Sequence, residues 1–549
     1  LVEENQMESV DLNCAQNCTN HNTQFFSDQK LIVRRGQTFG FYVHFQNREW
    51  NDEKDKITFT VETGPKPCES LGTKSIFPLG GCPDQCHWNA SFKSHDAKCL
   101  RVNMFPPANA CVGCYSLNMC LVSCDHTNSQ NLGDFYVLFN PWCSDDPVYL
   151  DSQDQREEYV LNEHGIIFQG LPEHITAHPW HFGQFQDGIL DICLKMLDTS
   201  TNFLRDPAMD CSCRNDPLYI SRVLNNMVNI LKLPSNNNLL QGLSPLTWNG
   251  SVPILRQWYQ SRCKPIKYGD CATFASVLCT VLRCFGIPGR VVTGFYCPVY
   301  AADPLSVQEI FDYTGKTLNG KEHMIYHCWN ESWMAEKDIN QSGGDWQFLD
   351  PTPVETSKGS VCSGPIWVKS IRDGDVDTDS EGHRVFCMLN ARSTAWISQG
   401  KGKKTKLHCD SGTSGQCIST KSVGSDLRED ITDAYKKINS QYLNAPNSEI
   451  DKDIASHRNK SLKETGITMK LKMANCPLYG QDVQMNWVLE NLCNESKERK
   501  FNLCAQAMMH NGCALDQLWK DTIHVTLEPK EGIFFYIYVY SHILGYIQI

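Results

Sequence analysis

The sequence predicts a multidomain α+β protein with β-rich regions at both ends and a mixed helix–strand region between them. Its 549 residues allow three or four domains at roughly 100–200 residues each. Alternating apolar segments, typical of half-buried strands, flank a middle region with helical periodicity. With 41% hydrophobic and 20% charged residues, the composition supports buried cores of ordinary size.

The first β-rich region covers residues 30 to 145. The segment KLIVRRGQTFGFYVHF alternates around a Gly turn, and KITFTVETG and DFYVLFNPWC predict further strands. The Cys-x-x-Cys pair that begins at Cys111 has half the pattern of a zinc site, but no matching pair follows at zinc-finger spacing. We therefore predict disulfides, with connectivity left open, for the cysteines that crowd here: Cys68, Cys82, Cys86, Cys99, Cys111, Cys114, Cys120 and Cys124.

The middle region begins near residue 147, where DGILDICLKMLD and DPLYISRVLNNMVNILK predict helices. The polar residues 436 to 464 predict a linker. After the linker, TGITMKLKM, VQMNWVLEN, TIHVTLEP and FFYIYVYS predict strands. The apolar stretch GIFFYIYVYSHILGYIQI contains Tyr, Ser, His and Gly, so we expect sheet rather than a membrane span.

Cysteine content, glycosylation motifs and charge predict the compartment and exclude some partners. The 28 cysteines indicate an oxidising environment, and no signal peptide opens the chain. The net charge of −12 argues against nucleic acid or an anionic membrane as the main partner. We expect a secreted glycoprotein with N-x-S/T motifs, each weak alone, at Asn17, Asn89, Asn249, Asn330, Asn340, Asn459 and Asn494.

One cysteine stands where a helix is predicted to begin. In YGDCATFASVLCTVLRCFGIPGR, apolar residues follow a helical face until Gly286 and Pro288 end it. Cys271 therefore lies in the first turn, where the helix dipole and unpaired N–H groups lower the pKa of a thiol. Cys279 and Cys284 lie deeper in the same helix and are predicted to be structural.

A thiolate nucleophile needs a base, and the base needs an orienting group. MIYHCWNESWM places His327 in a predicted strand, and DWQFLDPTPVE places Asp350 at a strand end. By these features alone, His327 is more often a core histidine and Asp350 a turn residue. The residues by themselves leave both interpretations open.

Long motifs in the chain strongly resemble the animal transglutaminases. They include YGDCATFASVLCTVLRCFGIPGRVVTGF, YHCWNESWM, WQFLDPTPVETSKG and FNPWCSDDPVYL, and the resemblance covers nearly the whole chain. It implies an immunoglobulin-like β-sandwich, a papain-like cysteine-protease-type α/β core, a linker and a first C-terminal β-barrel or sandwich, with the family's second barrel absent. The corresponding ranges are 1–146, 147–440, 441–464 and 465–549.

The resemblance also implies a chemistry. The family's Cys-His-Asp triad falls on Cys271, His327 and Asp350, and the reaction transfers the acyl group of a protein glutamine to a lysine amine. No cofactor is required for that chemistry, and the partners are proteins that carry glutamine and lysine. Family members are monomers or homodimers.

Departures from the family pattern surround the nucleophile. Asp270 and Ala272 replace a Gln and a Trp, so a carboxylate flanks the thiol. Met324 replaces one tunnel tryptophan, and the other, an oxyanion donor, aligns near Ser235. Because losing one oxyanion donor typically costs about 10²–10³ in rate, we predict reduced efficiency and a shift toward glutamine deamidation.

Calcium control and capping are also altered relative to the family. Asp303 alone remains of one calcium loop, and a cation follows Asn390 where a second site had an anion. In the third calcium site of the family, Asn236 and Asn238 offer carbonyl oxygens. We therefore expect at most one weak calcium site. His510 stands where several relatives have a tyrosine that caps the nucleophile, which makes it a candidate regulatory cap.

Two functions of different classes follow. The first is a secreted transglutaminase of low efficiency that cross-links or deamidates protein. The second is an impaired relative that serves as a structural, storage or ligand-binding glycoprotein. The complete triad favours the first function, and the altered tunnel and calcium loops favour the second.

Overall fold

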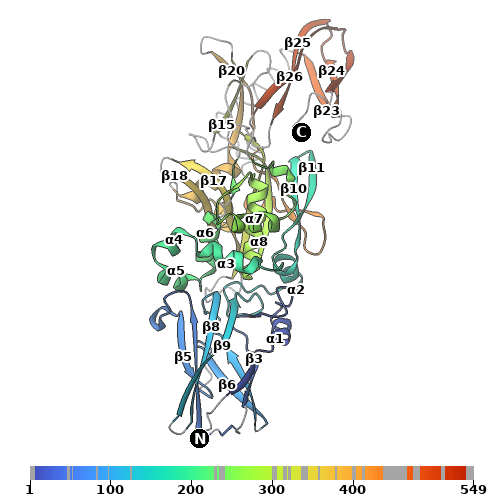
Figure 1. Ribbon diagram of the computed structural model, residues 1–549. Coiled ribbons are helices and arrows are strands. Elements are labelled where there is room, and N and C mark those ends of the chain that lie inside the picture. The colour runs from blue at the N-terminus through green and yellow to red at the C-terminus, as the bar shows by residue number, and fades with distance from the viewer. Residues whose placement is uncertain are drawn as a thin grey trace.

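The computed structural model describes the sandwich, the core and a C-terminal group of strands. Figure 1 shows an elongated molecule with the blue N-terminal strands at one end, the green and yellow core in the middle, and the orange-red strands at the other end. The described residues are 7–45, 50–51, 53–81, 85–96, 98–123, 126–227, 231–233, 242–298, 306–312, 318, 323–335, 344–356, 359–377, 380–398, 403–410, 414–436, 466–473, 483–508 and 514–539.

The N-terminal region is a sandwich of two sheets around an apolar core. One sheet has the order β1 (Met7–Asp11), β3 (Phe39–Phe45), β7 (Cys99–Phe105), β6 (Asn89–Asp96). The other has the order β2 (Leu31–Arg34), β9 (His126–Leu138), β8 (Gly113–Ser123), β4 (Asp55–Thr63), β5 (Lys74–Pro78). Burial alternates along β3 and β4, as the period-2 pattern of the sequence predicts.

The core is built on a six-stranded sheet. Its order is β18 (Gly359–Trp367), β17 (Gly344–Thr356), β16 (His323–Ala335), β14 (Gly289–Pro298), β21 (Gln416–Lys421), β22 (Arg428–Asp430). The predicted helix is confirmed as α8 (Cys271–Phe285), which packs against β14, β16 and β17. Gly286 ends α8 at φ 88, and a side chain there would collide with Phe139.

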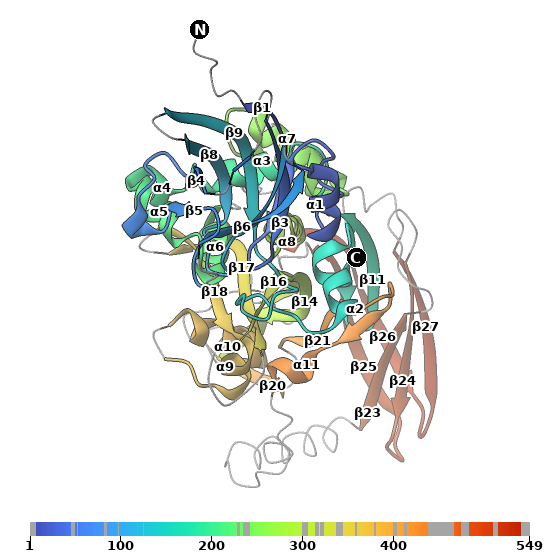
Figure 2. The ribbon, with the colours of Figure 1, turned by 90° about the horizontal axis from the view of Figure 1, so that it is seen from below.

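Helices cover both faces of this sheet. On the face of α8 lie α3 (Ile189–Leu197), α6 (Pro217–Met227) and α7 (Ser251–Gln260), whose apolar residues share one core cluster with α8. The opposite face is covered by α9 (Val368–Asp373), α10 (Glu381–Asn390) and α11 (Thr432–Tyr435). Figure 2 shows α9, α10 and α11 together near β14, β18 and β21. The α/β core is thus three-layered, as its mixed pattern predicts.

Shorter elements connect these layers. The helices and turns are α1 (Cys14–Asn20), η1 (Glu69–Leu71), α2 (Gln153–Arg156), η2 (Glu157–Leu161), α4 (Thr201–Arg205), α5 (Pro207–Cys213) and η4 (Pro245–Thr247). The strands are β10 (His164–Leu171), β11 (His174–His181), β12 (Leu231–Lys232), β13 (Ile266–Lys267), β15 (Ser306–Phe311), β19 (Arg392–Ser398) and β20 (Lys404–Asp410).

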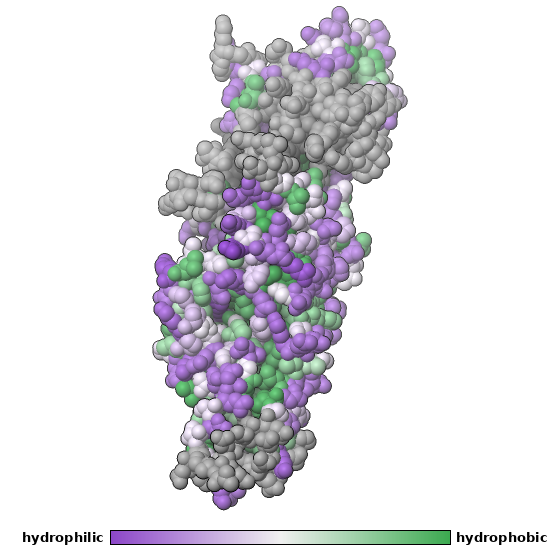
Figure 3. Space-filling view, in the orientation of Figure 1, coloured by the Kyte–Doolittle hydropathy of each residue, from purple (hydrophilic) through white to green (hydrophobic). Residues whose placement is uncertain are grey.

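The C-terminal region is all β in its described part, as predicted. One group of strands has the order β23 (Ile467–Met473), β24 (Val483–Asn491), β27 (Gly532–Val539), and β25 (Lys497–Met508) pairs with β26 (Ala514–Leu527). The predicted linker from 441 lies outside the described residues. Figure 3 shows polar and apolar residues interspersed over the visible face of sandwich and core. None of the described helices combines the length and apolarity that crossing a membrane requires.

Candidate active site

Cys271 is the first residue of α8, at the end of the helix that favours an anion. The residue before it, Asp270, caps the helix, because its carboxylate accepts hydrogen bonds from the Thr273 backbone N–H at 2.8 Å and from the Thr273 hydroxyl at 2.6 Å. The carboxylate predicted to flank the thiol is therefore committed to Thr273. Asp270 is therefore the N-cap residue of α8, a structural role that the sequence alone did not reveal.

His327 and Asp350 come from neighbouring strands of the central sheet. His327 lies on β16 opposite Gly294 of β14, and Asp350 lies on β17. The His327 Nε2 atom is 2.7 Å from Asp350 Oδ2. The other oxygen of Asp350 accepts the Thr352 N–H at 2.9 Å, which fixes the carboxylate. Asp350 thus orients the imidazole, as a triad requires.

The charges around His327 favour its protonated form. Burial by itself would lower the pKa of His327, but the negative charge and hydrogen bond of Asp350 raise it from 6.5 to about 10, and the Cys271 side chain adds a further increase. At neutral pH the imidazole is therefore an imidazolium beside the thiol. A neighbouring imidazolium is the environment that stabilises a thiolate.

All three side chains are withdrawn from solvent. Cys271 is 4% exposed, His327 3% and Asp350 1%. In such a water-poor site the attraction between a thiolate and an imidazolium is stronger than at the surface.

A second polar network, which was not predicted from the sequence, supports the strand that carries His327. The Trp329 ring lies tilted beside the His327 ring with centroids 6.3 Å apart, and its indole N–H donates to the Tyr435 hydroxyl at 2.8 Å. The Tyr435 hydroxyl donates in turn to Glu331, which pairs with Arg290 at 2.6 Å. Alternation along YHCWNESWM, which puts positions 327, 329 and 331 on one face, is the signal that would have indicated it.

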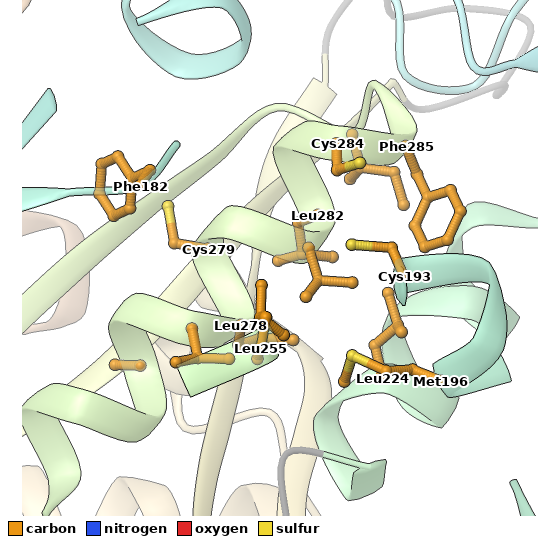
Figure 4. Close-up of a cluster of buried hydrophobic side chains, with 14 of the residues drawn as sticks. Phe182, Cys193, Met196, Leu224, Leu255, Leu278, Cys279, Leu282, Cys284 and Phe285 are labelled. Carbon is orange, nitrogen blue, oxygen red and sulfur yellow. The ribbon is translucent and has the colours of Figure 1, made fainter. Parts of the chain in front are cut away.

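The other two thiols of α8 are buried in the core cluster, where Arg283 lies beside Cys279. Figure 4 shows Cys279 near Phe182, and Cys284 facing Cys193 of α3. Both are fully buried, and burial raises the pKa of each thiol. Their surroundings agree with the structural role predicted for them.

The predicted tunnel and cap positions are only partly described. Ala272 is buried in the first turn of α8, and its carbonyl accepts the Ser276 hydroxyl at 2.7 Å. Met324 lies on β16 opposite Cys297 and packs, partly buried, against the core. Ser235 and His510 lie outside the described residues, so their proposed roles remain predictions.

Of the four predicted calcium ligands, only Asn390 lies in the described part of the chain, so the calcium site stays a prediction. Asn236, Asn238 and Asp303 lie outside it. Asn390 ends α10, and its amide donates to the Phe386 carbonyl at 2.9 Å. Among the described residues no three acidic, His or Cys side chains converge as metal ligands.

Two glycosylation predictions are wrong. The Asn17 amide nitrogen, in a residue only 3% exposed, donates to the carbonyls of Leu12 and Gly40. Asn330 is fully buried and donates to Ala275 at 2.8 Å. A glycan attaches at this nitrogen, so both asparagines are structural.

The remaining motifs differ in accessibility. Asn249 and Asn494 are exposed, and Asn89 is intermediate. Asn340 and Asn459 lie outside the described residues. Glycosylation therefore stays a prediction for these five motifs.

Among the crowded cysteines of the sandwich, free thiols in the structure include Cys68, Cys111, Cys114 and Cys120. Cys114 and Cys120 lie six positions apart on β8, too far apart along one strand to pair with each other. Cys82 and Cys124 lie outside the described residues. Disulfide pairing in the sandwich therefore remains a prediction.

Comparison with known proteins finds related sequences over most of the chain. Residues 8–122 match the "Transglutaminase family", residues 256–351 the "Transglutaminase-like superfamily", and residues 467–543 the "Transglutaminase family, C-terminal ig like domain". "Protein-glutamine gamma-glutamyltransferase 5" of Homo sapiens is 39% identical, and "Protein-glutamine gamma-glutamyltransferase 2" of Gallus gallus is 40% identical. The match covers 95% and 96% of this chain and 78% of each relative.

A solved structure matches as well. The crystal structure of red sea bream transglutaminase superposes with a TM-score of 0.84 at 30% identity, over 98% of this chain and 80% of the other. This likeness confirms the multidomain α+β fold predicted from the sequence. Together with the sequence matches, it shows that the chain belongs to the transglutaminase family.

Proposed function

We propose that the chain transfers the acyl group of a protein-bound glutamine, with Cys271 as nucleophile. The observation that carries the proposal is the hydrogen-bonded pair of His327 and Asp350, 2.7 Å apart, set against the first turn of α8. The relatives are named protein-glutamine gamma-glutamyltransferases, and the family acts on protein glutamine and lysine.

The proposed reaction has two steps. The Cys271 thiolate attacks the glutamine carboxamide carbon, the C–N bond breaks, and His327 gives its proton to the departing ammonia, which leaves a thioester. A lysine amine then attacks the thioester, His327 takes the proton from the amine, and the thiolate is released with an isopeptide product. If water attacks instead, the product is glutamate.

The proposed balance between these outcomes is set by the residues around Cys271. Ala272 and Met324 are smaller or more flexible than the tryptophans they replace, so water competes with the amine and overall efficiency is low. Secretion is part of the proposal, because glycosylation motifs and 28 cysteines suit that compartment.

The experiment measures the two products together. Purified chain is incubated with a glutamine-donor protein, a fluorescent primary amine and ¹⁸O water, with and without calcium. We expect amine incorporation and ¹⁸O-labelled glutamate, both absent in Cys271→Ala. If neither product exceeds the Cys271→Ala control in either condition, the chain is a non-catalytic relative.

The non-catalytic alternative has one structural observation in its favour. The nucleophile is 4% exposed, and a scaffold protein would have no reason to open that site. Alkylation of Cys271 under native conditions distinguishes the two. An enzyme that opens reacts at a measurable rate, whereas a closed scaffold reacts only when it unfolds.

A further inference from the structure

Where the sandwich meets the core, two segments are tied together around Cys111. The Arg35 guanidinium, fully buried and paired with Asp146 at 2.7 Å, donates to the carbonyls of Ala110 at 2.8 Å and Asn215 at 2.9 Å. One residue beyond Cys111, the Val112 N–H donates to the Arg214 carbonyl at 3.1 Å. Both neighbours of Cys111 are therefore fixed to the chain that follows α5.

The Cys111 side chain points at α5. Its Sγ atom lies 3.6 Å from the carbonyl oxygen of Ser212, between the two cysteines of the helix. Burial, opposed in part by Arg35, raises the pKa of Cys111 to about 11, and the nearby Cys211 contributes more to this rise than Cys213 does. The thiol of the sandwich thus faces a helix of the core that carries two thiols.

The geometry of α5 allows only one of its two cysteines, Cys211 or Cys213, to face the sandwich. Residues two apart in an α-helix point about 200° away from each other, so only one of these thiols faces the sandwich. The Cys211 Sγ packs against Gly64, at the end of β4, so closely that a Cβ on Gly64 would lie 2.8 Å away. Cys211 is 4% exposed and Cys111 3%, whereas Cys213 is more exposed.

We propose that Cys111 and Cys211 form a disulfide that covalently joins the β-sandwich to the catalytic core. The oxidant is a low-molecular-weight disulfide such as oxidised glutathione. One protein thiolate attacks it and releases a glutathione thiolate, and the second attacks the mixed disulfide and releases another. Two protein thiols are oxidised and one glutathione disulfide is reduced to two thiols.

The surroundings of the pair predict how the reaction depends on pH. Burial raises the pKa of both Cys111 and Cys211 to about 11, so both are protonated at neutral pH. The bridge therefore forms faster as pH rises from 7 toward 9. Burial limits the access of glutathione in both directions, so both the formation and the reduction of the bridge are slow.

The test is peptide mapping of the full chain. The protein is incubated with oxidised and reduced glutathione at pH 8.5, the remaining thiols are blocked in acid, and tryptic peptides are read by mass spectrometry. We expect a peptide joining Cys111 to Cys211, 2 Da lighter than its reduced parts. The unfolding midpoint of the sandwich should rise by about 5–10 °C on oxidation.

Single-residue variants distinguish a bridge between Cys111 and Cys211 from bridges to other cysteines. Cys111→Ser and Cys211→Ser should abolish both the linked peptide and the rise in midpoint, while Cys120→Ser, on the outer side of β8, should change neither. Glutathione on Cys68, whose pKa is lowered by a hydrogen bond from Ser70, shows that the oxidant has acted. Reduced Cys111 and Cys211 in that sample, or a bridge from Cys111 to Cys68 or Cys213, would overturn the proposal.

Discussion

One helix holds three cysteines in two contrasting environments. Cys271 begins α8 beside a protonated imidazole, whereas Cys279 and Cys284 lie in the apolar layer between α8 and its neighbouring elements. The pKa of His327 is raised by Asp350, while burial raises the pKa of the two inner thiols. The comparison shows that the environment of a thiol, rather than the residue type, determines whether the thiol is reactive.

The largest effect should come from removing one thiol from each of the two environments. Cys271→Ala should lower amine incorporation by at least about 10⁴-fold, because Cys271 is the thiol that hydrogen-bonds His327. The matched variant Cys279→Ala should keep the rate and reduce stability by about 1–2 kcal/mol through a small cavity. Amine incorporation and thermal unfolding measure the two effects, and equal loss of activity in both variants would contradict the assignment.

Removing the orienting carboxylate should have the next largest effect. Asp350→Asn should slow the reaction by roughly 10²–10⁴-fold, because the imidazole loses the charge and the tautomer that Asp350 imposes. The control is Asp345→Asn on the same strand, whose carboxylate bonds only the Trp346 and Lys369 N–H groups in the described structure. That variant should keep full thiol reactivity, which the rate of Cys271 alkylation reports.

The pH dependence of Cys271 alkylation sharpens the comparison further. The pKa of His327 is raised to about 10, so its imidazolium stays charged across neutral pH. The stability that this charge contributes to the folded state is complete below pH 6.5 and is lost as the pH rises through about 10. Replacement by His327→Gln removes that cation. At pH 6 we expect wild-type alkylation to be about 10-fold faster than that of His327→Gln.

The mass-mapped alkylation of Cys279 in the same samples is the internal control. Its pKa is raised by burial, so it should stay unmodified at pH 6 in both proteins. A pH profile for Cys271 that is identical with and without His327 would show that the imidazolium does not act on the thiol.

The smallest effect is expected in the network behind His327. Tyr435→Phe removes the acceptor of the Trp329 N–H and the donor to Glu331, both buried, which should reduce stability by about 1–3 kcal/mol. Activity should fall only a few-fold, because Asp350 still orients His327. Denaturant unfolding and amine incorporation measure these, with Tyr149→Phe, whose hydroxyl bonds only Asp151, as the control.

Much of the fold follows from local sequence pattern. The alternation of FGFYVHF produces β3, and the periodicity that ends at Gly286 produces α8. The same local logic failed at Asn17 and Asn330, whose motifs indicate glycans. Burial of their amides depends on elements distant in the chain, so no local pattern reports it.

The role of Asp270 shows the same limit at the site. Beside a thiol, a carboxylate in the sequence predicts repulsion of a negative charge. In the structure it caps α8 through Thr273, an interaction set by the extended backbone of Asp270. The Glu331–Arg290 pair was likewise hidden, because its partners lie on two strands that meet only in the folded sheet.

The sequence by itself determined the helix that begins at Cys271, the β-rich ends and the membership in the transglutaminase family, because each rests on residues close together in the chain. The tertiary structure decided the geometry with which His327 and Asp350, already placed in one triad by the resemblance, bond at 2.7 Å. It also decided that the inner thiols of α8 are buried in the core and that Cys111 faces α5. The physical reason is that charge, burial and hydrogen bonding act through space. Such distances are fixed only when α8 packs across β14, β16 and β17.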